Sequence, residues 1–357
     1  MNMNKVKLTV PCQWNMDSIK TIIDIHGKDD IEIAELYGAL SNGKLPQGRD
    51  HTVAHQTTRN EANKIKRILE SQKIRFAYLI NTPVNMQLYE YLEEELEWII
   101  NDFKADSLTI SSIELFEFIR KRYPSVHINV STIAGIKTID DIKPYLSLEP
   151  SKIIAHHDLN RNFDDLANVI EFLGNENIDF EIMVNESCLR RCPFREQHYQ
   201  DLGEGKSDRV FHEKCNEIKI QTPYQILMAN FIRPEDLRLY ENMGVNLFKI
   251  TGRSKPIGWL EEVVYAYMNR QYNGNLFRLL GTDPLLEVEK KIFLANKALT
   301  GFLNKYPKLG KVDEEIEYCE QWIKELFENN NFKLESIPVN PHLSESKLRF
   351  SIDGNIY

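Results

Sequence analysis

The stretch KIIAHHDLNRNFDDLANVIEFLGNENIDFEIMV, residues 152–184, contains the pattern that decides the fold. A short β-rich apolar run, Lys152–His156, begins it, and a second one, Phe180–Val184, ends it. Between them, Asp164–Leu173 has helical periodicity and opens with two acidic residues, which favour a helix N-terminus. A strand, a helix and a strand in this order predict a βαβ unit with parallel strands.

The same alternation continues along most of the chain. Strands are predicted at Val6–Val10, Ile31–Leu36, Ile74–Ile80, Leu108–Ser111, Val126–Ser131, Lys152–His156, Phe180–Val184 and Val245–Ile250. Further helices are predicted at Asn85–Asp102, Asp140–Leu146 and Glu235–Met243. Eight strands that alternate with helices are what a (β/α)8 barrel requires. We therefore predict an α/β fold with a TIM-like barrel.

Two regions interrupt the repeat. Before the last strand, about 60 residues form an insertion that begins near Cys188 and includes Cys215. After about Leu280 the strand pattern stops, and the following segments, Leu286–Leu303 and Val312–Glu328, are predicted to be helical. The expected division is a TIM-like barrel catalytic domain over residues 1–280 and a helical C-terminal extension over residues 281–357.

The composition excludes several classes of protein. Of 357 residues, 42% are hydrophobic, which is enough for an ordinary globular core. The 44 basic and 53 acidic residues give a net charge of -9, which disfavours binding to nucleic acid. No apolar run approaches the roughly 18 residues needed to span a bilayer, and Met1–Val10 lacks the features of a secretory leader. We expect a cytoplasmic protein.

The strongest chemical signal is a group of cysteines. Five cysteines occur in the chain, and three of them, Cys188, Cys192 and Cys215, lie within 28 positions. Residues 185–195 read NESCLRRCPFR, so two thiols are separated by three residues, a spacing that lets one turn present both to a metal. Nearby arginines favour the thiolate form and offset the charge of a cluster. The spacing alone allows an iron-sulfur cluster or a zinc ion, and the alternative is three ordinary cysteines.

A fourth ligand is also expected from the strand pattern. Cys12 follows the first predicted strand as Cys188 follows the seventh, and both positions belong to the rim where barrel active sites are built. Cys12 is therefore a candidate ligand, although a buried cysteine at a strand end is an equal alternative. A radical S-adenosylmethionine enzyme would need a cysteine at position 195, where Arg195 stands, so that class is disfavoured.

Other polar residues are expected at the same rim. Glu35, placed at the end of the second strand, is a candidate general acid or base, and a salt bridge is its alternative role. Lys249 and Arg253, in and after the last strand, are candidates to bind a carboxylate or phosphate. His156 and His157 end the sixth strand, and adjacent strand residues point to opposite faces, so one of them is expected to face the site. We take His156 as that candidate.

The sequence resembles the collagenase-like peptidases, a family of peptidases of unknown type. The resemblance rests on Glu35-Leu36-Tyr37-Gly38-Ala39, on Gly48-Arg49, on the cysteine segment, and on Phe248-Lys249-Ile250-Thr251-Gly252-Arg253 with Tyr267 in the next helix. It covers about Lys5 to Leu280. The lysine-isoleucine-x-glycine-arginine segment is the most specific match.

The resemblance implies a barrel-like catalytic domain and a 4Fe-4S cluster held by four cysteines. Better understood members are similar to oxygen-independent hydroxylases that act in ubiquinone biosynthesis or on RNA bases, and several are thought to take oxygen from prephenate. One branch places a ligand near the N-terminus, which fits Cys12. The family's His-Gly-Ala segment before the first ligand is replaced here by Asn185-Glu186-Ser187. The ligand spacing differs as well.

Two functional hypotheses follow. The first is an iron-sulfur enzyme, resembling oxygen-independent hydroxylases, that acts on a small molecule or a modified biosynthetic intermediate, with an oxygen-donating carboxylate as a candidate partner. A peptidase is the enzymatic alternative, although no His-Glu-x-x-His segment is present. The second is a non-catalytic metal-binding subunit that works with a related partner subunit. A cluster with one labile iron would favour the enzyme, and a cluster with four protein ligands would favour the subunit.

Overall fold

The computed structural model describes residues 6–27, 31–45, 47–50, 53–82, 89–282, 286–307 and 311–334. Eight parallel strands pair in sequence order and close into a barrel, because β1 pairs with both β2 and β8. The eight strands are β1 (Val6–Pro11), β2 (Ile31–Gly38), β3 (Arg75–Ile80), β4 (Ser107–Ile110), β5 (Ile128–Val130), β6 (Lys152–Ile154), β7 (Asp179–Met183) and β8 (Leu247–Lys249). The predicted TIM-like barrel and all eight of its strands are therefore confirmed.

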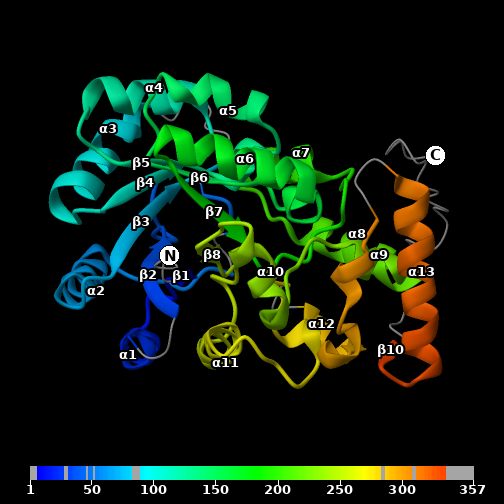
Figure 1. The fold of residues 1–357 in the computed structure, drawn as a ribbon. Helices are drawn as coiled ribbons and strands as arrows, with labels where there is room; N and C mark the ends of the chain where they lie inside the picture. The colour runs from blue at the N-terminus through cyan, green and yellow to red at the C-terminus, as the bar shows by residue number, and fades with distance from the viewer. Residues whose placement is uncertain are drawn as a thin grey trace.

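Helices surround the strands, as Figure 1 shows. The helices that alternate with the strands are α1 (Met16–Ile25), α2 (Arg59–Ser71), α3 (Tyr89–Glu97), α4 (Ile113–Arg122), α5 (Ile139–Leu146), α6 (Phe163–Glu176) and α11 (Ile257–Met268). The first residues of the helix predicted at Asn85–Asp102 lie outside the described residues, and α3 followed by one π-helical turn confirms the rest. None of the described helices is both long and apolar enough to cross a membrane.

Local sequence explains where these helices begin and what they bury. Thr58 accepts a hydrogen bond from the backbone nitrogen of Glu61, and the Glu61 carboxylate accepts one from the backbone nitrogen of Thr58, which forms a capping box at the start of α2. In α6, Leu166, Val169 and Leu173 follow helical spacing and are buried, so one stripe of the helix packs on the barrel. Such stripes hold the helical ring against the strands.

The insertion before the last strand is confirmed and is helical. It contains α7 (Arg195–Gly203), α8 (Arg209–Gln221), α9 (Tyr224–Met228) and α10 (Leu237–Asn242). The two cysteines nearest β7 precede α7, and Cys215 lies within α8. The chain therefore leaves the carboxyl end of β7, builds a helical cover over that rim, and returns through α10 to β8.

The C-terminal extension differs in part from the prediction. Helix α13 (Val312–Glu328) has the predicted bounds, but Leu286–Leu303 is wrong as a single helix. It contains the short α12 (Val288–Lys291), strand β9 (Ile292–Leu294) and two 3-10 turns. The physical reason is tertiary: β9 pairs antiparallel with β10 (Phe332–Leu334), a partner that periodicity within the segment does not reveal. The division at residues 280 and 281 stays a prediction.

Buried polar contacts attach the extension to the insertion. Arg190, just after the first cysteine of the insertion, lies 3.1 Å from the carboxylate of Glu315 on α13. The same guanidinium donates to the hydroxyl of Tyr306 at 3.1 Å. Arg161 is fully buried, with its guanidinium 5.0 Å from the ring centre of Tyr306. Figure 1 shows α13 beside α9, so the extension supports the insertion from outside.

Candidate functional site

The barrel interior contains a buried charged layer. Lys152 on β6 lies 2.6 Å from Glu35 and 3.3 Å from Glu181 on β7, and Thr9 donates a hydrogen bond to Glu181. Lys249 on β8 lies 3.6 Å from the other oxygen of Glu181. The two ammonium groups and two carboxylates balance in charge, which a buried ionic group requires.

The pKa values in this layer show how its members interact. Burial alone would raise the pKa of Glu181, but Lys152 and Lys249 together hold it below the ordinary value. Burial lowers the pKa of Lys249 to about 8, although Glu181 opposes the shift. Among the described residues the nitrogen of Lys249 has no hydrogen-bond partner, and it lies 3.8 Å from the ring centre of Tyr37. Lys249 is thus a buried cation with unused donor capacity.

A cavity lies above this layer, at the carboxyl ends of the strands, and its volume is about 980 Å³ with its open mouth included. We call it the rim cavity. Its wall includes Arg49, Cys188, Cys192, Arg195, Lys249 and Arg253. Active sites of this fold occupy the same rim.

Positive charge exceeds negative charge in the rim cavity. Among the described lining residues, the four cations are Arg49, Arg195, Lys249 and Arg253, and the two carboxylates are Glu186 and Asp208. The excess is two positive charges, opposite in sign to the net charge of the whole chain. The cations lie close enough to affect one another, because burial and the neighbouring Arg49 lower the pKa of Arg253 to about 10. The cavity therefore favours an anionic ligand.

The loop that carries Arg253 depends on a glycine. Gly252 has a φ of 129°, a conformation that disfavours side chains, and an added Cβ would lie 2.4 Å from the ring of Trp259. Glycine thus lets the chain turn sharply between β8 and α11. The turn brings Arg253 to the cavity, where it donates a hydrogen bond to Gln47. Lys249 and Arg253 therefore lie at one cavity, as the sequence predicted.

Three of the predicted thiols lie together. Burial is the main reason that the pKa of Cys188 lies well above its ordinary value, and the nearby Cys192 and Cys215 contribute to the rise. Arg195 opposes it for both Cys188 and Cys192. Arg190 pairs instead with Glu315, so the arginines of the segment do not all lie beside the thiols. Arg191 has a φ of 53°, which marks a tight turn between the two lining cysteines.

The structure does not bring Cys12 to these thiols. Its exposed fraction is 2%, it belongs to the hydrophobic core, and it is not among the described residues that line the rim cavity. Its backbone nitrogen donates to the carbonyl of Tyr37 at 2.9 Å, and an added Cβ on Gly38 would lie 3.4 Å from its own Cβ. The alternative role, a buried cysteine at a strand end, describes it better. Cys319 is likewise buried, on α13.

The thiol spacing bears on which metal fits. The described histidine, cysteine and carboxylate side chains form two groups whose ligand atoms all lie within 4.8 Å of one another, and neither group contains a cysteine. Thiolates on one zinc ion lie about 3.8 Å apart, given Zn–S bonds of about 2.3 Å. The spacing therefore does not match a preassembled three-thiolate zinc site. A four-iron cluster is larger, and the three neighbouring thiols fit its donor chemistry.

The prediction for Glu35 needs correction. Strand β2 continues to Gly38, so Glu35 lies within the strand and not at its end. It is 2% exposed and paired with Lys152 inside the barrel, and it is not among the described residues that line the rim cavity. The salt bridge named as its alternative role is what the structure contains.

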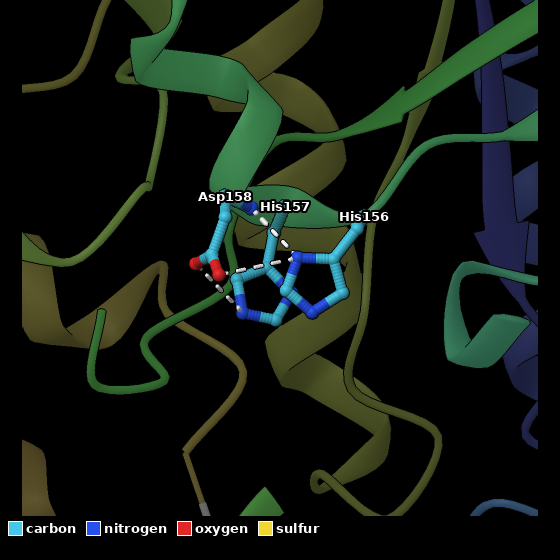
Figure 2. Close-up of side chains that lie close together, drawn as sticks. All are labelled: His156, His157 and Asp158. Carbon is cyan, nitrogen blue, oxygen red and sulfur yellow. Dashed lines mark hydrogen bonds and ion pairs between the residues drawn. The ribbon is translucent and has the colours of Figure 1, made fainter. Parts of the chain in front are cut away.

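The prediction for His156 also needs correction. Strand β6 ends at Ile154, and the backbone then forms a 3-10 turn, so the alternation of a strand does not apply. Figure 2 shows the rings of His156 and His157 on the same side, and they stack with centroids 4.2 Å apart. Burial lowers the pKa of His156 to about 3, which keeps its ring neutral. Neither histidine lines the described part of the rim cavity.

One feature of the site was missed by the sequence reasoning. His198 on α7 and His212 on α8 each place Nε2 at 3.2 Å from the same oxygen of Asp208, and all three line the rim cavity. The spacing of Asp208 and His212, four residues apart on one helical face, was a readable signal. The contribution of His198 comes from another helix and requires the tertiary structure.

Comparisons with known proteins agree on one family. A family model described as Peptidase family U32 matches residues 49–274. A Methanocaldococcus jannaschii protein named uncharacterized protease MJ1657 is 30% identical over 263 residues, which cover 71% of this chain and 77% of that protein.

Solved structures are more distant. The structure described as the U32 peptidase Mk0906 matches 70% of this chain and 93% of its own, with 12% identity and a TM-score of 0.48. The structure described as KGPDC from Streptococcus mutans matches 76% of this chain and 97% of its own, with 12% identity and a TM-score of 0.38. Likenesses at this level carry no argument about function.

Proposed function

This chain belongs to peptidase family U32, and from that premise we propose that it is an iron-sulfur enzyme related to the oxygen-independent hydroxylases, acting on a small carboxylate-bearing molecule in the rim cavity. The cluster would be held by Cys188, Cys192 and Cys215. When bound, such a cluster supplies one-electron chemistry or a Lewis-acidic iron. The protein supplies binding, orientation and electrostatics.

The observation that carries the proposal is the absence of a fourth cysteine beside three neighbouring thiols. Of the five cysteines, all of which lie in the described part of the chain, Cys12 and Cys319 are in the core. A cluster on three thiolates keeps one iron without a cysteine ligand, which is the arrangement expected of an enzyme rather than of a purely structural site. Because Cys188 and Cys192 line the rim cavity, a ligand bound there would lie beside the residues that hold the cluster.

The cationic wall of the cavity supports an anionic substrate. Within the described part of the chain, Lys249 has no hydrogen-bond partner, and the Nε of Arg49 is also buried without one. A carboxylate placed between these groups would accept hydrogen bonds from donors that otherwise have no partner. This removes the desolvation cost of leaving them buried and unpaired. Arg195, beside the thiols, would offset part of the negative charge of the cluster. The residues therefore bind and orient the substrate on one side and neutralise the cluster on the other.

A peptidase is the alternative that the name of the archaeal relative supports. The two functions differ in what they need from the thiols. Peptide hydrolysis would persist in protein from which iron has been removed, or would depend on a single nucleophile. The proposed enzyme would lose its activity together with its iron. A non-catalytic subunit would bind the cluster but would show no coupling between the cluster and a ligand in the rim cavity.

The effect of an anion in the rim cavity on the cluster tests the proposal. The whole protein, purified without oxygen and reduced, is examined by electron paramagnetic resonance with and without millimolar succinate or inorganic phosphate. We expect a cluster signal whose g-values shift with at least one anion, and no shift in Lys249→Met. The matched control, Lys143→Met, removes a lysine that is 62% exposed and should respond like the wild type. A missing signal, or an equal response in Lys249→Met and wild type, would overturn the proposal.

A further inference from the structure

The strongest feature outside the thiol group is formed by His198, Asp208 and His212. His198 lies on α7 and His212 on α8, yet both place Nε2 at 3.2 Å from the same carboxylate oxygen, Oδ2 of Asp208. The ligand atoms of the three residues all lie within 4.8 Å of one another. Two imidazole nitrogens and one carboxylate oxygen thus converge from two separate helices.

Two of the three separations in the group match the dimensions of a metal site. Zinc binds histidine nitrogen and carboxylate oxygen at about 2.1 Å, so adjacent ligand atoms around one ion lie roughly 3.0 to 3.4 Å apart in octahedral or tetrahedral geometry. The observed nitrogen-oxygen separations of 3.2 Å fall inside that range. Two histidines and one carboxylate on one side of an ion form a set that leaves other positions open.

The local structure holds the three side chains in place. Asp208 occupies the N-cap position of α8, but its carboxylate makes no capping hydrogen bond and faces the two histidines instead. The ring of His198 stacks on Phe211, with centroids 5.0 Å apart and planes 19° apart. The carboxylate of Asp208 is thus directed at the two histidines and not at the first turn of α8.

The second histidine group of the fold is less suitable for a metal. In Figure 2, the rings of His156 and His157 stack face to face, and their ligand nitrogens lie 3.4 and 3.8 Å from the two oxygens of Asp158, farther than in the group of His198, Asp208 and His212. Asp158 already accepts from Asn230 at 2.9 Å and pairs with Lys137 at 3.5 Å. A cation there would compete with these donors.

We propose that His198, Asp208 and His212 bind a divalent transition-metal ion such as Zn²⁺ or Fe²⁺, as a second metal site separate from the thiols. All three residues line the rim cavity, so the open coordination positions of the ion face it. The ion adds positive charge to a cavity that is already suited to an anion, and it can bind an oxygen atom of that anion directly. The site does not require the iron-sulfur cluster.

Zinc content tests the site. The whole protein is purified without oxygen, dialysed against micromolar Zn²⁺, and its bound zinc is measured by mass spectrometry. We expect one more zinc per chain in the wild type than in His198→Gln or in His212→Gln. The control is His127→Gln, because His127 is an exposed histidine that contacts Ser151 and not this group. Circular dichroism and the melting temperature establish that each variant is folded.

Two further variants separate this site from the thiols. Cys188→Ala should keep the additional zinc, and Asp208→Asn should lose it, whether or not iron is present. With Co²⁺ in place of zinc, the Cys188→Ala protein should show weak visible bands without an intense thiolate charge-transfer band. Equal zinc in the wild type, His198→Gln and His212→Gln would overturn the proposal, as would its loss in Cys188→Ala alone. Failure of the iron-sulfur proposal would leave these results unchanged.

Discussion

The ammonium nitrogen of Lys249 lies 3.6 Å from Oε2 of Glu181, and in the described structure neither atom has a hydrogen-bond partner. Burial lowers the pKa of Lys249 to about 8. Glu181 and Glu35 raise it, while Lys152 and Arg253 lower it. Lys249 is therefore mostly charged at neutral pH, and it loses its charge within a range that ordinary experiments reach.

Anion binding should accordingly weaken with rising pH. An anion binds the protonated form of Lys249, so we expect the affinity for succinate to fall as the pH rises through about 8, far below the ordinary lysine pKa of about 10.4. Isothermal titration calorimetry at several pH values on both sides of pH 8 measures this. Lys249→Met should bind more weakly and without that pH dependence. Constant affinity across the range in the wild type would contradict the assignment.

The contact between the insertion and the extension predicts a stability effect. Arg190 and Glu315 are 3% and 1% exposed and lie 3.1 Å apart. Removing one partner leaves a buried charge, so Glu315→Gln should lower the free energy of unfolding by about 3 to 5 kcal/mol, as measured by urea denaturation. The control is Glu314→Gln, because Glu314 belongs to an exposed pair with Lys311 and should have little effect. Equal effects of the two substitutions would argue against this contact.

The loop after β8 predicts a combined effect on stability and binding. At Gly252 a side chain would meet both an unfavourable φ of 129° and the ring of Trp259 at 2.4 Å. Gly252→Ala should therefore lower the free energy of unfolding by about 1 to 3 kcal/mol and weaken succinate binding by displacing Arg253. Gly258→Ala is the matched control, because no atom lies within 4 Å of the added Cβ. If the two variants bind succinate equally well, the loop does not position Arg253.

The sequence was sufficient for the barrel because strands and helices alternate with clear periods. It was insufficient where a partner far along the chain decides the structure. Strand β9 pairs with β10, and the two histidines after β6 leave the strand geometry because the strand ends at Ile154 and a 3-10 turn begins at His157. Periodicity describes the pattern within one segment, and it does not reveal contacts with residues far along the chain.

The candidate site was inferred from local signals as well. Spacing led to Cys188 and Cys192, and the last strand with the loop after it led to Lys249 and Arg253; all four line the rim cavity. Whether a side chain is buried was harder to infer from the sequence than whether it follows a strand. Cys12 does follow a strand, but it faces the core, which the sequence could not decide. Charged residues within otherwise apolar strands, such as Glu181, could have predicted the buried charged layer beneath the cavity.

The iron and acid-labile sulfide content of the protein, purified without oxygen, tests the central claim most directly. A 4Fe-4S cluster predicts about four iron and four sulfide per chain in the wild type, with visible absorption. Cys188→Ala should lose most of both, whereas the core variants Cys319→Ala and Cys12→Ala should keep them. A colourless wild-type protein without iron, or undiminished iron in Cys188→Ala, would contradict the account.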